Sequence, residues 1–470
     1  MAAINVVVEG GRWPKCSAPH VVDSNVTGVT EPTAERPRKR RRIWIAVVVV
    51  GLVLVLGGVV LLGAMKSKLN DSKNALYDGK LVAADYWSDK PQILSSGFGF
   101  DGIVAASAVD RQSTIDAGGA FDDKMTCNKD GGATDADRSS LVPSSTLTTT
   151  AQIEDGANPQ FVDGTPVVFS WPVRTDTLRP SQFRWTLNTG EVVGVDAVTM
   201  TPNFEYNERN TVVMFTDLGN RGLPGEKDAR YPVRLDVVPA SDGTELMLAG
   251  PNGDVSATGL SNTTDNTPYA SGPTLVGAKL NRIDSSPLGE GPVAQNGAGS
   301  MPNDERTMYG DKGNFRLRML TTGGFSPDGI RGVLPTDFQK FFRIHAKGPN
   351  GSDVVIDKAG VPVAVAGGTL TVVGLSDVGK PASTDGQVFY DDCYADDHDN
   401  YFDVIISGDD AAARSITTLE IPALSGGYSA FYNPGGPGQT PTPGVRYTAP
   451  GPTTLQPVIV ALDNPMRVNR

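Results

Sequence analysis

A chain of 470 residues is too long for one ordinary hydrophobic core, and its apolar content of 39% is sufficient for packed domains over most of its length. The net charge of −12 conceals an asymmetry: residues 1–42 carry eight Lys/Arg against four Asp/Glu, whereas residues 66–470 carry 33 against 49. So acidic a body excludes nucleic acid as a partner, because phosphate contacts need a basic surface.

The first two predicted segments are a disordered basic cytoplasmic tail, residues 1–42, and a transmembrane helix, residues 43–65. The second segment reads IWIAVVVVGLVLVLGGVVLLGAM, contains no charged residue, and is long enough to cross the ~30 Å hydrocarbon core of a bilayer. A cleaved signal peptide is the alternative, with a weak site at Gly63-Ala64-Met65.

A basic cluster immediately before the apolar run predicts the orientation of the chain. Basic residues beside a spanning helix stay on the cytoplasmic side, so the N-terminus is expected in the cytoplasm and residues 66–470 outside it. The predicted protein is therefore a single-pass, signal-anchor protein of the cell membrane with the lipid bilayer as a partner. The orienting residues are Arg36, Arg38, Lys39, Arg40, Arg41 and Arg42.

Residues 66–155 are predicted to form a juxtamembrane region followed by a linker. Gly97-Phe98-Gly99-Phe100-Asp101-Gly102 matches the spacing of a dinucleotide-binding loop, but no strand–helix–strand pattern surrounds it, which favours a glycine-rich turn. The Ser/Thr/Pro-rich stretch SSLVPSSTLTTT is typical of an extended linker.

The rest of the chain predicts a mainly β fold. Short runs rich in Val, Phe, Trp and Thr alternate with turn residues over 156–275 and again over 313–424, which predicts two antiparallel β-sandwich (Ig-like) domains. Gly/Pro-rich sequence is expected to form a connector over 276–312 and a C-terminal tail over 425–470, where LQPVIVAL predicts one added strand.

The stretch DDCYADDHDNYFD is the strongest candidate for a ligand site. Its crowded carboxylates repel one another unless they are solvated or neutralised, and Ca²⁺ is the cation that such oxygen ligands collect outside the cell. The spacing does not fit an EF-hand, and a solvated acidic loop is the alternative. The predicted Ca²⁺ ligands are Asp391, Asp392, Asp396, Asp397, Asp399 and Asp403.

Cys127 and Cys393 are the two cysteines predicted to lie outside the cytoplasm, while Cys16 lies before the apolar run. An oxidising compartment favours a disulfide between Cys127 and Cys393. Two free buried thiols are the alternative.

Catalytic motifs give little support to an enzyme. Glu205 and Glu208 are candidates for paired catalytic carboxylates, as in glycosidases, or for a surface turn with Arg209 as counter-ion. His345 alternates within a predicted strand, which favours a structural role. The sequence contains no G-x-S-x-G, H-E-x-x-H or Walker motif.

These observations predict extracytoplasmic β domains that act in binding, adhesion or envelope structure, with a protein or glycan partner. The alternative is a membrane-anchored hydrolase that uses Glu205 and Glu208 or the 391–403 stretch. A pocket that joins carboxylates of both regions would favour the enzyme, and an exposed sheet edge would favour binding.

Overall fold

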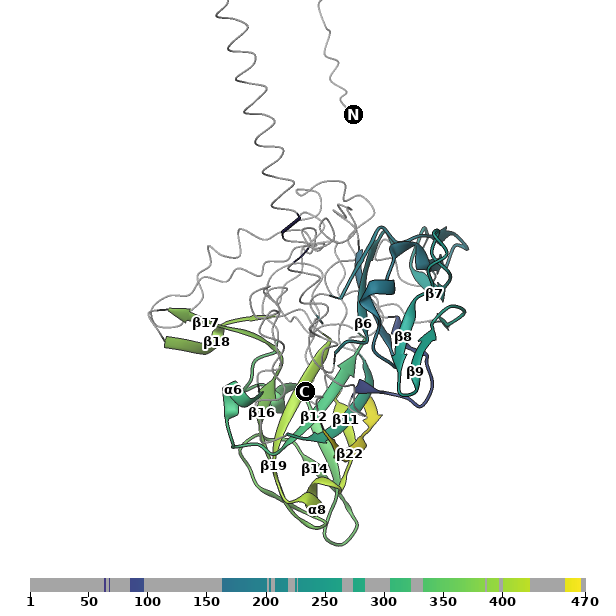
Figure 1. The fold of residues 1–470 in the computed structure, drawn as a ribbon. Coiled ribbons are helices and arrows are strands. Elements are labelled where there is room, and N and C mark those ends of the chain that lie inside the picture. Colours follow the sequence, from purple (N-terminus) through teal and green to yellow (C-terminus); the bar gives the residue numbers. More distant parts are fainter. Residues whose placement is uncertain are drawn as a thin grey trace, which may run out of the picture. The chain divides into compact units, whose positions relative to one another are not determined.

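The computed structural model shows a mainly β protein built from several antiparallel sheets (Figure 1). No helix within the described residues is both long and apolar enough to cross a bilayer. Of the predicted membrane segment, only Gly63 and Ala64 are described. The structure describes residues 63–64, 67, 85–96, 163–200, 203, 208–218, 225, 227–263, 274–283, 305–322, 333–384, 387–396, 400–422 and 453–465.

The first sheet pair consists of two four-stranded sheets, ordered β1-β2-β6-β5 and β10-β7-β3-β4, which share one hydrophobic core. A short hairpin of β8 and β9 adds Leu248 to this core. Its strands are β1 (Ile93–Ser96), β2 (Asp163–Phe169), β3 (Phe183–Leu187), β4 (Val192–Val193), β5 (Ala197–Thr199), β6 (Thr211–Thr216), β7 (Pro232–Val237), β8 (Met247–Gly250), β9 (Gly253–Ser256) and β10 (Ser261–Thr263). Short 3-10 turns, η2 (Thr175–Thr177) and η3 (Pro180–Gln182), precede β3.

Alternation along β3 explains how its sheet faces the core. Phe183, Trp185 and Leu187 are buried, while Arg184 and Thr186 between them are partly exposed. In β6, by contrast, all six residues are buried, so both of its faces are covered. Because successive side chains of a strand point to opposite faces, β6 has a second packing partner besides the first core.

The second sheet pair packs a six-stranded sheet, ordered β15-β16-β19-β12-β11-β22, against a four-stranded sheet, ordered β14-β13-β20-β21. β11 and β22 run parallel, and every other pair in these sheets is antiparallel. Its strands are β11 (Leu275–Arg282), β12 (Phe315–Thr321), β13 (Arg343–Lys347), β14 (Asp353–Ile356), β15 (Val363–Val365), β16 (Gly368–Ser376), β19 (Tyr401–Gly408), β20 (Ile416–Ile421), β21 (Thr454–Pro457) and β22 (Ile459–Pro465).

Three short helices accompany the second pair: α6 (Glu305–Tyr309), α7 (Phe338–Phe341) and α8 (Asp410–Ala413). A separate two-stranded ribbon consists of β17 (Gly379–Thr384) and β18 (Gln387–Asp396). Phe338 and Phe341 of α7 and Ala412 and Ala413 of α8 belong to the core of the second pair.

The two sheet pairs meet at a small apolar cluster of Trp87, Val168, Leu320 and Tyr401. Val168 lies on β2 of the first pair, whereas Leu320 and Tyr401 lie on β12 and β19 of the second. Hydrogen bonds reinforce this junction: Thr211 donates to the Tyr401 hydroxyl at 3.0 Å, and that hydroxyl donates to Asn210 at 2.8 Å. The second sheet pair therefore contacts the second face of β6 at Thr211.

The structure extends both sheet pairs beyond the predicted domain boundaries. β1 lies in the predicted linker 66–155, and β11 and α6 lie in the predicted connector 276–312. The predicted C-terminal tail supplies two strands, β21 and β22, where the sequence indicated one. The sequence LVGAKLNR did not predict β11, because it contains polar residues without a regular alternation. A strand that is covered on both faces lacks the alternation of a half-buried strand.

Candidate functional site

Charged side chains from both sheet pairs meet in the junction and are almost completely buried. Arg316 and Arg318 lie on β12 and Asp403 on the adjacent β19, while Glu208 comes just before β6 of the first pair. None of these side chains is more than 3% exposed. With two further buried carboxyl groups they form the junction cluster, defined as Glu208, Glu305, Arg316, Arg318, Asp377 and Asp403.

Arg318 is the centre of this cluster because it contacts three carboxyl groups. Its Nε and Nη2 donate to the two oxygens of Asp403 at 2.9 and 2.8 Å, a two-point pairing of guanidinium and carboxylate. Nη2 also donates to Asp377 at 2.6 Å, and Nη1 lies 2.5 Å from Glu208. One guanidinium thus joins the first sheet pair, through Glu208, to the second.

Strand register explains part of this arrangement. Arg318 and Asp403 are directly paired across β12 and β19, and both point to the face of the sheet that meets the first pair. Asp377 reaches the cluster from the residue after β16, with a φ of +58°. Left-handed backbone is rare outside glycine, and such positions concentrate where the surrounding structure imposes them.

Arg316 lies two residues before Arg318 on β12, on the same face of the strand, and forms the second half of the cluster. Its Nη1 lies 3.2 Å from Asp403 and 3.8 Å from Glu305 at the start of α6. Burial raises the pKa of Glu305, and the nearby Arg316 only partly opposes that rise. The Glu305 carboxyl is therefore a weaker partner for Arg316 than Asp403 is.

Asp377 has the most strongly perturbed carboxyl group of the cluster. Burial raises its pKa well above the usual range, the neighbouring Glu208 raises it further, and Arg318 lowers it only in part. Asp377 and Glu305 therefore hold their protons to a higher pH than a solvated carboxyl group does.

A second group of buried charges surrounds the start of the segment Asp85–Ser96. It consists of Asp85, Arg209 and Lys279. Asp85 pairs with Arg209 at 2.8 Å, and both side chains are fully buried. Lys279 of β11 donates to the Tyr86 carbonyl at 2.5 Å and lies 4.6 Å from the centre of the Trp87 ring. Burial lowers the pKa of Lys279 to about 7. This segment, which follows the predicted membrane helix in sequence, thus contacts both sheet pairs.

The geometry of the junction cluster suits a rigid connection better than chemistry. A catalytic carboxylate must reach substrate, whereas these carboxyl groups lie in the interior and contact arginine. Among the described residues, no group of three or more His, Cys, Asp or Glu has the arrangement of a metal site. The six residues instead form contacts between guanidinium and carboxyl groups across the junction.

The predicted Ca²⁺ ligands are only partly described. Asp403 lies on β19 and pairs with Arg318 and Arg316. The backbone of β18 contains Asp391, Asp392 and Asp396, so these three belong to a strand and not to the expected loop. Asp397 and Asp399 lie outside the described residues, and calcium binding by the set stays a prediction.

Of the two predicted catalytic carboxylates, only one lies within the described residues. Glu208 belongs to the junction cluster, and Glu205 lies outside the described residues. The Arg209 side chain, expected as a surface counter-ion, is buried against Asp85. Cys127 also lies outside the described residues, while Cys393 falls on β18, so the disulfide stays a prediction.

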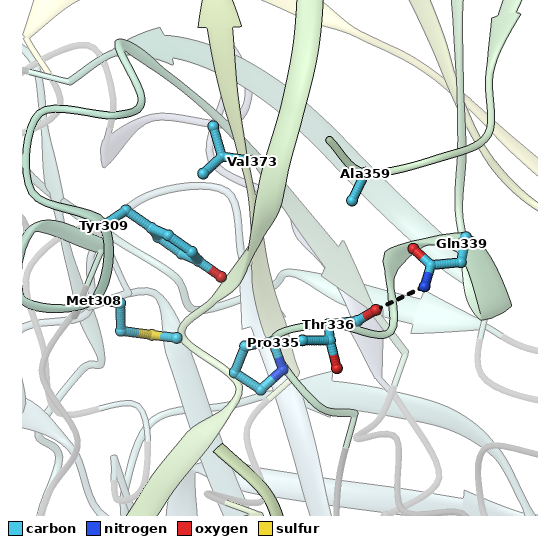
Figure 2. A pocket seen from close by; sticks show the side chains of 7 residues that line it. All are labelled: Met308, Tyr309, Pro335, Thr336, Gln339, Ala359 and Val373. Carbon is cyan, nitrogen blue, oxygen red and sulfur yellow. Dashed lines mark hydrogen bonds between the residues drawn. The ribbon is translucent and has the colours of Figure 1, made fainter. Parts of the chain in front are cut away.

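A pocket of about 380 Å³ opens elsewhere on the second sheet pair (Figure 2). Tyr309 donates to the Leu375 carbonyl at 2.5 Å, and Gln339 donates to the Thr336 carbonyl at 3.0 Å. The side chains that line it within the described residues are uncharged. Its lining residues are Met308, Tyr309, Pro335, Thr336, Gln339, Ala359 and Val373.

His345 lies on the outer face of the β14-β13-β20-β21 sheet, between two carboxylates of neighbouring strands. Its Nδ1 is 2.9 Å from Asp353 on β14, and its Nε2 is 2.6 Å from Glu420 on β20. Burial lowers the pKa of His345, but the hydrogen bonds to Glu420 and Asp353 outweigh this effect and raise it overall. The histidine therefore links three strands, consistent with the structural role predicted for it.

Comparison of the chain with protein-family models, with curated proteins and with solved structures finds no match.

Proposed function

We propose that this chain is a single-pass membrane protein whose extracytoplasmic β-sandwich domains act in binding, adhesion or envelope structure. The apolar run at residues 43–65 and the preceding cations support the membrane anchor and its orientation. Two sheet pairs, each with its own core, support the sandwich architecture of the outer part.

The observation that carries the choice between binding and hydrolysis is the position of Arg318. A hydrolase of the predicted kind would bring carboxylates of both acidic regions into one pocket. Glu208 and Asp403 do come together, which is the specific point in favour of the hydrolase as the second candidate. Arg318 occupies the space between them, however, and the group is buried, so it supports a rigid outer body that presents its surface to a partner.

Labelling with a membrane-impermeant maleimide tests the proposed topology on intact cells. Val192 is 60% exposed, so Val192→Cys in the full-length chain is expected to react, whereas Cys16 reacts only after the membrane is opened. Reaction of Cys16 in intact cells, with the thiol introduced by Val192→Cys protected, would reverse the orientation and remove the proposal. The unsubstituted chain is the control for Cys127 and Cys393.

A separate assay tests the hydrolase alternative. Full-length protein is incubated with a panel of chromogenic glycosides, together with Glu208→Gln and Asp403→Asn. We expect no turnover above that of a buffer blank. Turnover that both substitutions abolish, with the far-UV circular dichroism unchanged, would favour the hydrolase over the binding protein.

A further inference from the structure

The C-terminal strands β21 and β22 are joined to the fold in an unusual way. β21 pairs with β20 at the edge of the four-stranded sheet. β22 pairs in parallel with β11 at the edge of the six-stranded sheet, and Figure 1 shows these two strands next to each other. Val458 alone separates the two strands, and its N–H donates to the Thr417 carbonyl at 2.9 Å. The single segment Thr454–Pro465 therefore completes both sheets of the second pair.

The connection to this segment is much longer than its pairing requires. Ile421, the last residue of β20, pairs directly with Thr454, the first residue of β21. Antiparallel strands in that register are normally closed by a hairpin loop of two to five residues. Residues 422–453 stand in that place instead, a length of chain that reaches up to roughly 100 Å when extended.

Apolar side chains also hold the segment to the fold, since Val458 and Val460 pack against the second core. Leu462 is buried in the core and Ala461 is 9% exposed, whereas the remaining described side chains from Thr454 to Asp463 are partly or largely exposed. Asn281 donates to the Ala461 carbonyl at 3.1 Å, and Arg414 pairs with Asp463 at 2.9 Å between exposed side chains. The attachment thus combines main-chain pairing at two edges with these side-chain contacts, and an identical segment of another copy reproduces both.

Apolar side chains lie on the outward side of the same segment. Leu455 is 58% exposed and Ile459 is 47% exposed, and both are on edge strands. Exposed edges with apolar residues are the usual sites at which a further chain adds to a sheet. β22 is an edge strand and pairs with β11 alone, so only one strand pairing holds it in its sheet.

We propose that Thr454–Pro465 is exchanged between two copies of this chain, so that β21 and β22 of each copy complete the second sheet pair of the other. Exchange of an identical element creates a dimer without new contacts, because every pairing formed between copies replaces the same pairing within one copy. The long connection allows the segment to reach another copy. Because β21 and β22 are edge strands, each must separate from only one neighbouring strand. The inference concerns the partner of the second sheet pair and does not depend on the membrane anchor.

Disulfide trapping between co-expressed full-length chains tests the exchange. Thr418 and Pro457 are directly paired across β20 and β21, with side chains on the outer face. One copy carries Thr418→Cys and one tag, the other carries Pro457→Cys and a second tag. We expect an oxidised dimer that contains both tags, with the crosslinked 418–457 peptide identified by mass spectrometry.

Two further variants make the result decisive. The double variant Thr418→Cys/Pro457→Cys, expressed alone, reports whether the pairing forms within one chain. An internal disulfide in a monomer, with no mixed dimer in the co-expression, would overturn the proposal. Absence of any 418–457 crosslink in either experiment would overturn it too, because the exchanged pairing would not exist.

The matched control replaces residues 423–452 with Asn-Gly, which leaves a hairpin-length loop between Ile421 and Thr454. With this short loop we expect the mixed dimer to disappear and the internal disulfide of the double variant to remain. Persistence of the mixed dimer would show that the crosslink does not depend on the long connection, and would contradict the part that residues 422–453 play in the proposal.

Discussion

At the scale of single residues, Arg318 supplies the positive charge that the buried carboxyl groups of the junction contact. Its guanidinium contacts Glu208, Asp377 and Asp403, so its removal leaves three carboxyl groups facing one another in the interior. A buried ion pair adds little net stability relative to an apolar pair, but the loss of one partner is costly because the other charge stays uncompensated.

We therefore expect Arg318→Met to lower the free energy of unfolding by about 3–5 kcal/mol, the range for breaking a buried pair. Urea unfolding of the purified chain, followed by fluorescence, measures the change. The matched control is Arg234→Met, since Arg234 pairs with Asp236 on the surface and such pairs contribute little. Equal stability of the two variants would contradict the charge-balancing role of Arg318.

At the scale of elements, the outer face of the β14-β13-β20-β21 sheet contains a pH-sensitive link. His345 donates to carboxylates on both neighbouring strands only when both of its ring nitrogens carry protons. Since its pKa is raised in the folded chain, the stability from these bonds is fully present below the unfolded pKa of about 6.5. That stability is lost as the pH rises through the folded pKa.

His345→Gln is accordingly expected to reduce the dependence of the melting temperature on pH above about 6.5, relative to the unchanged chain. Thermal unfolding at a series of pH values measures this difference. Asp353→Asn is expected to give a smaller reduction, because Glu420 remains. A variant with the same pH dependence as the unchanged chain would mean that the histidine is neutral in the fold.

The elements also show how far the sequence predicts this structure. Val- and Phe-rich runs correctly predicted β2, β3, β6, β13 and β19. In β3 and β13 burial of one face also leaves a clear alternation. The same alternation in NFRLRML suggests that Arg316 and Arg318 face water. They face the first sheet pair instead. Alternation in a sequence shows that a strand has two different faces, but it does not show what covers the second face.

The candidate site depended on this missing information. Asp403 belonged to a sequence stretch rich in carboxylates, so a cation such as Ca²⁺ was the expected neutralising partner. Its actual partners are the guanidinium groups of Arg316 and Arg318 on β12. Arg318 precedes Asp403 by 85 residues in the sequence. Two arginines in a strand otherwise made of apolar residues were the available signal, because each predicts a buried carboxylate on a neighbouring element.

At the scale of residues 85–465, an apolar contact joins the two sheet pairs at the junction. Trp87 lies between them, against Val168 of the first pair and Leu320 and Tyr401 of the second. Its ring is packed closely enough that a Cβ on Gly277 would lie 2.8 Å from it. Loss of this ring removes the apolar contact while leaving both cores intact.

Trp87→Ala is expected to cost about 3–5 kcal/mol and to separate the unfolding of the two sheet pairs. Calorimetry distinguishes the states, because the calorimetric and van't Hoff enthalpies agree for one cooperative transition and diverge for two. Trp185→Ala, within the first core, is the control that lowers the melting temperature by a similar mechanism without touching the junction. If Trp87→Ala still unfolds in one transition, the ion pairs of Arg318 and Arg209 are sufficient to couple the sheet pairs. Separation by Trp87→Ala alone would show that the apolar contact, more than the charges, makes the two sheet pairs act as one rigid body.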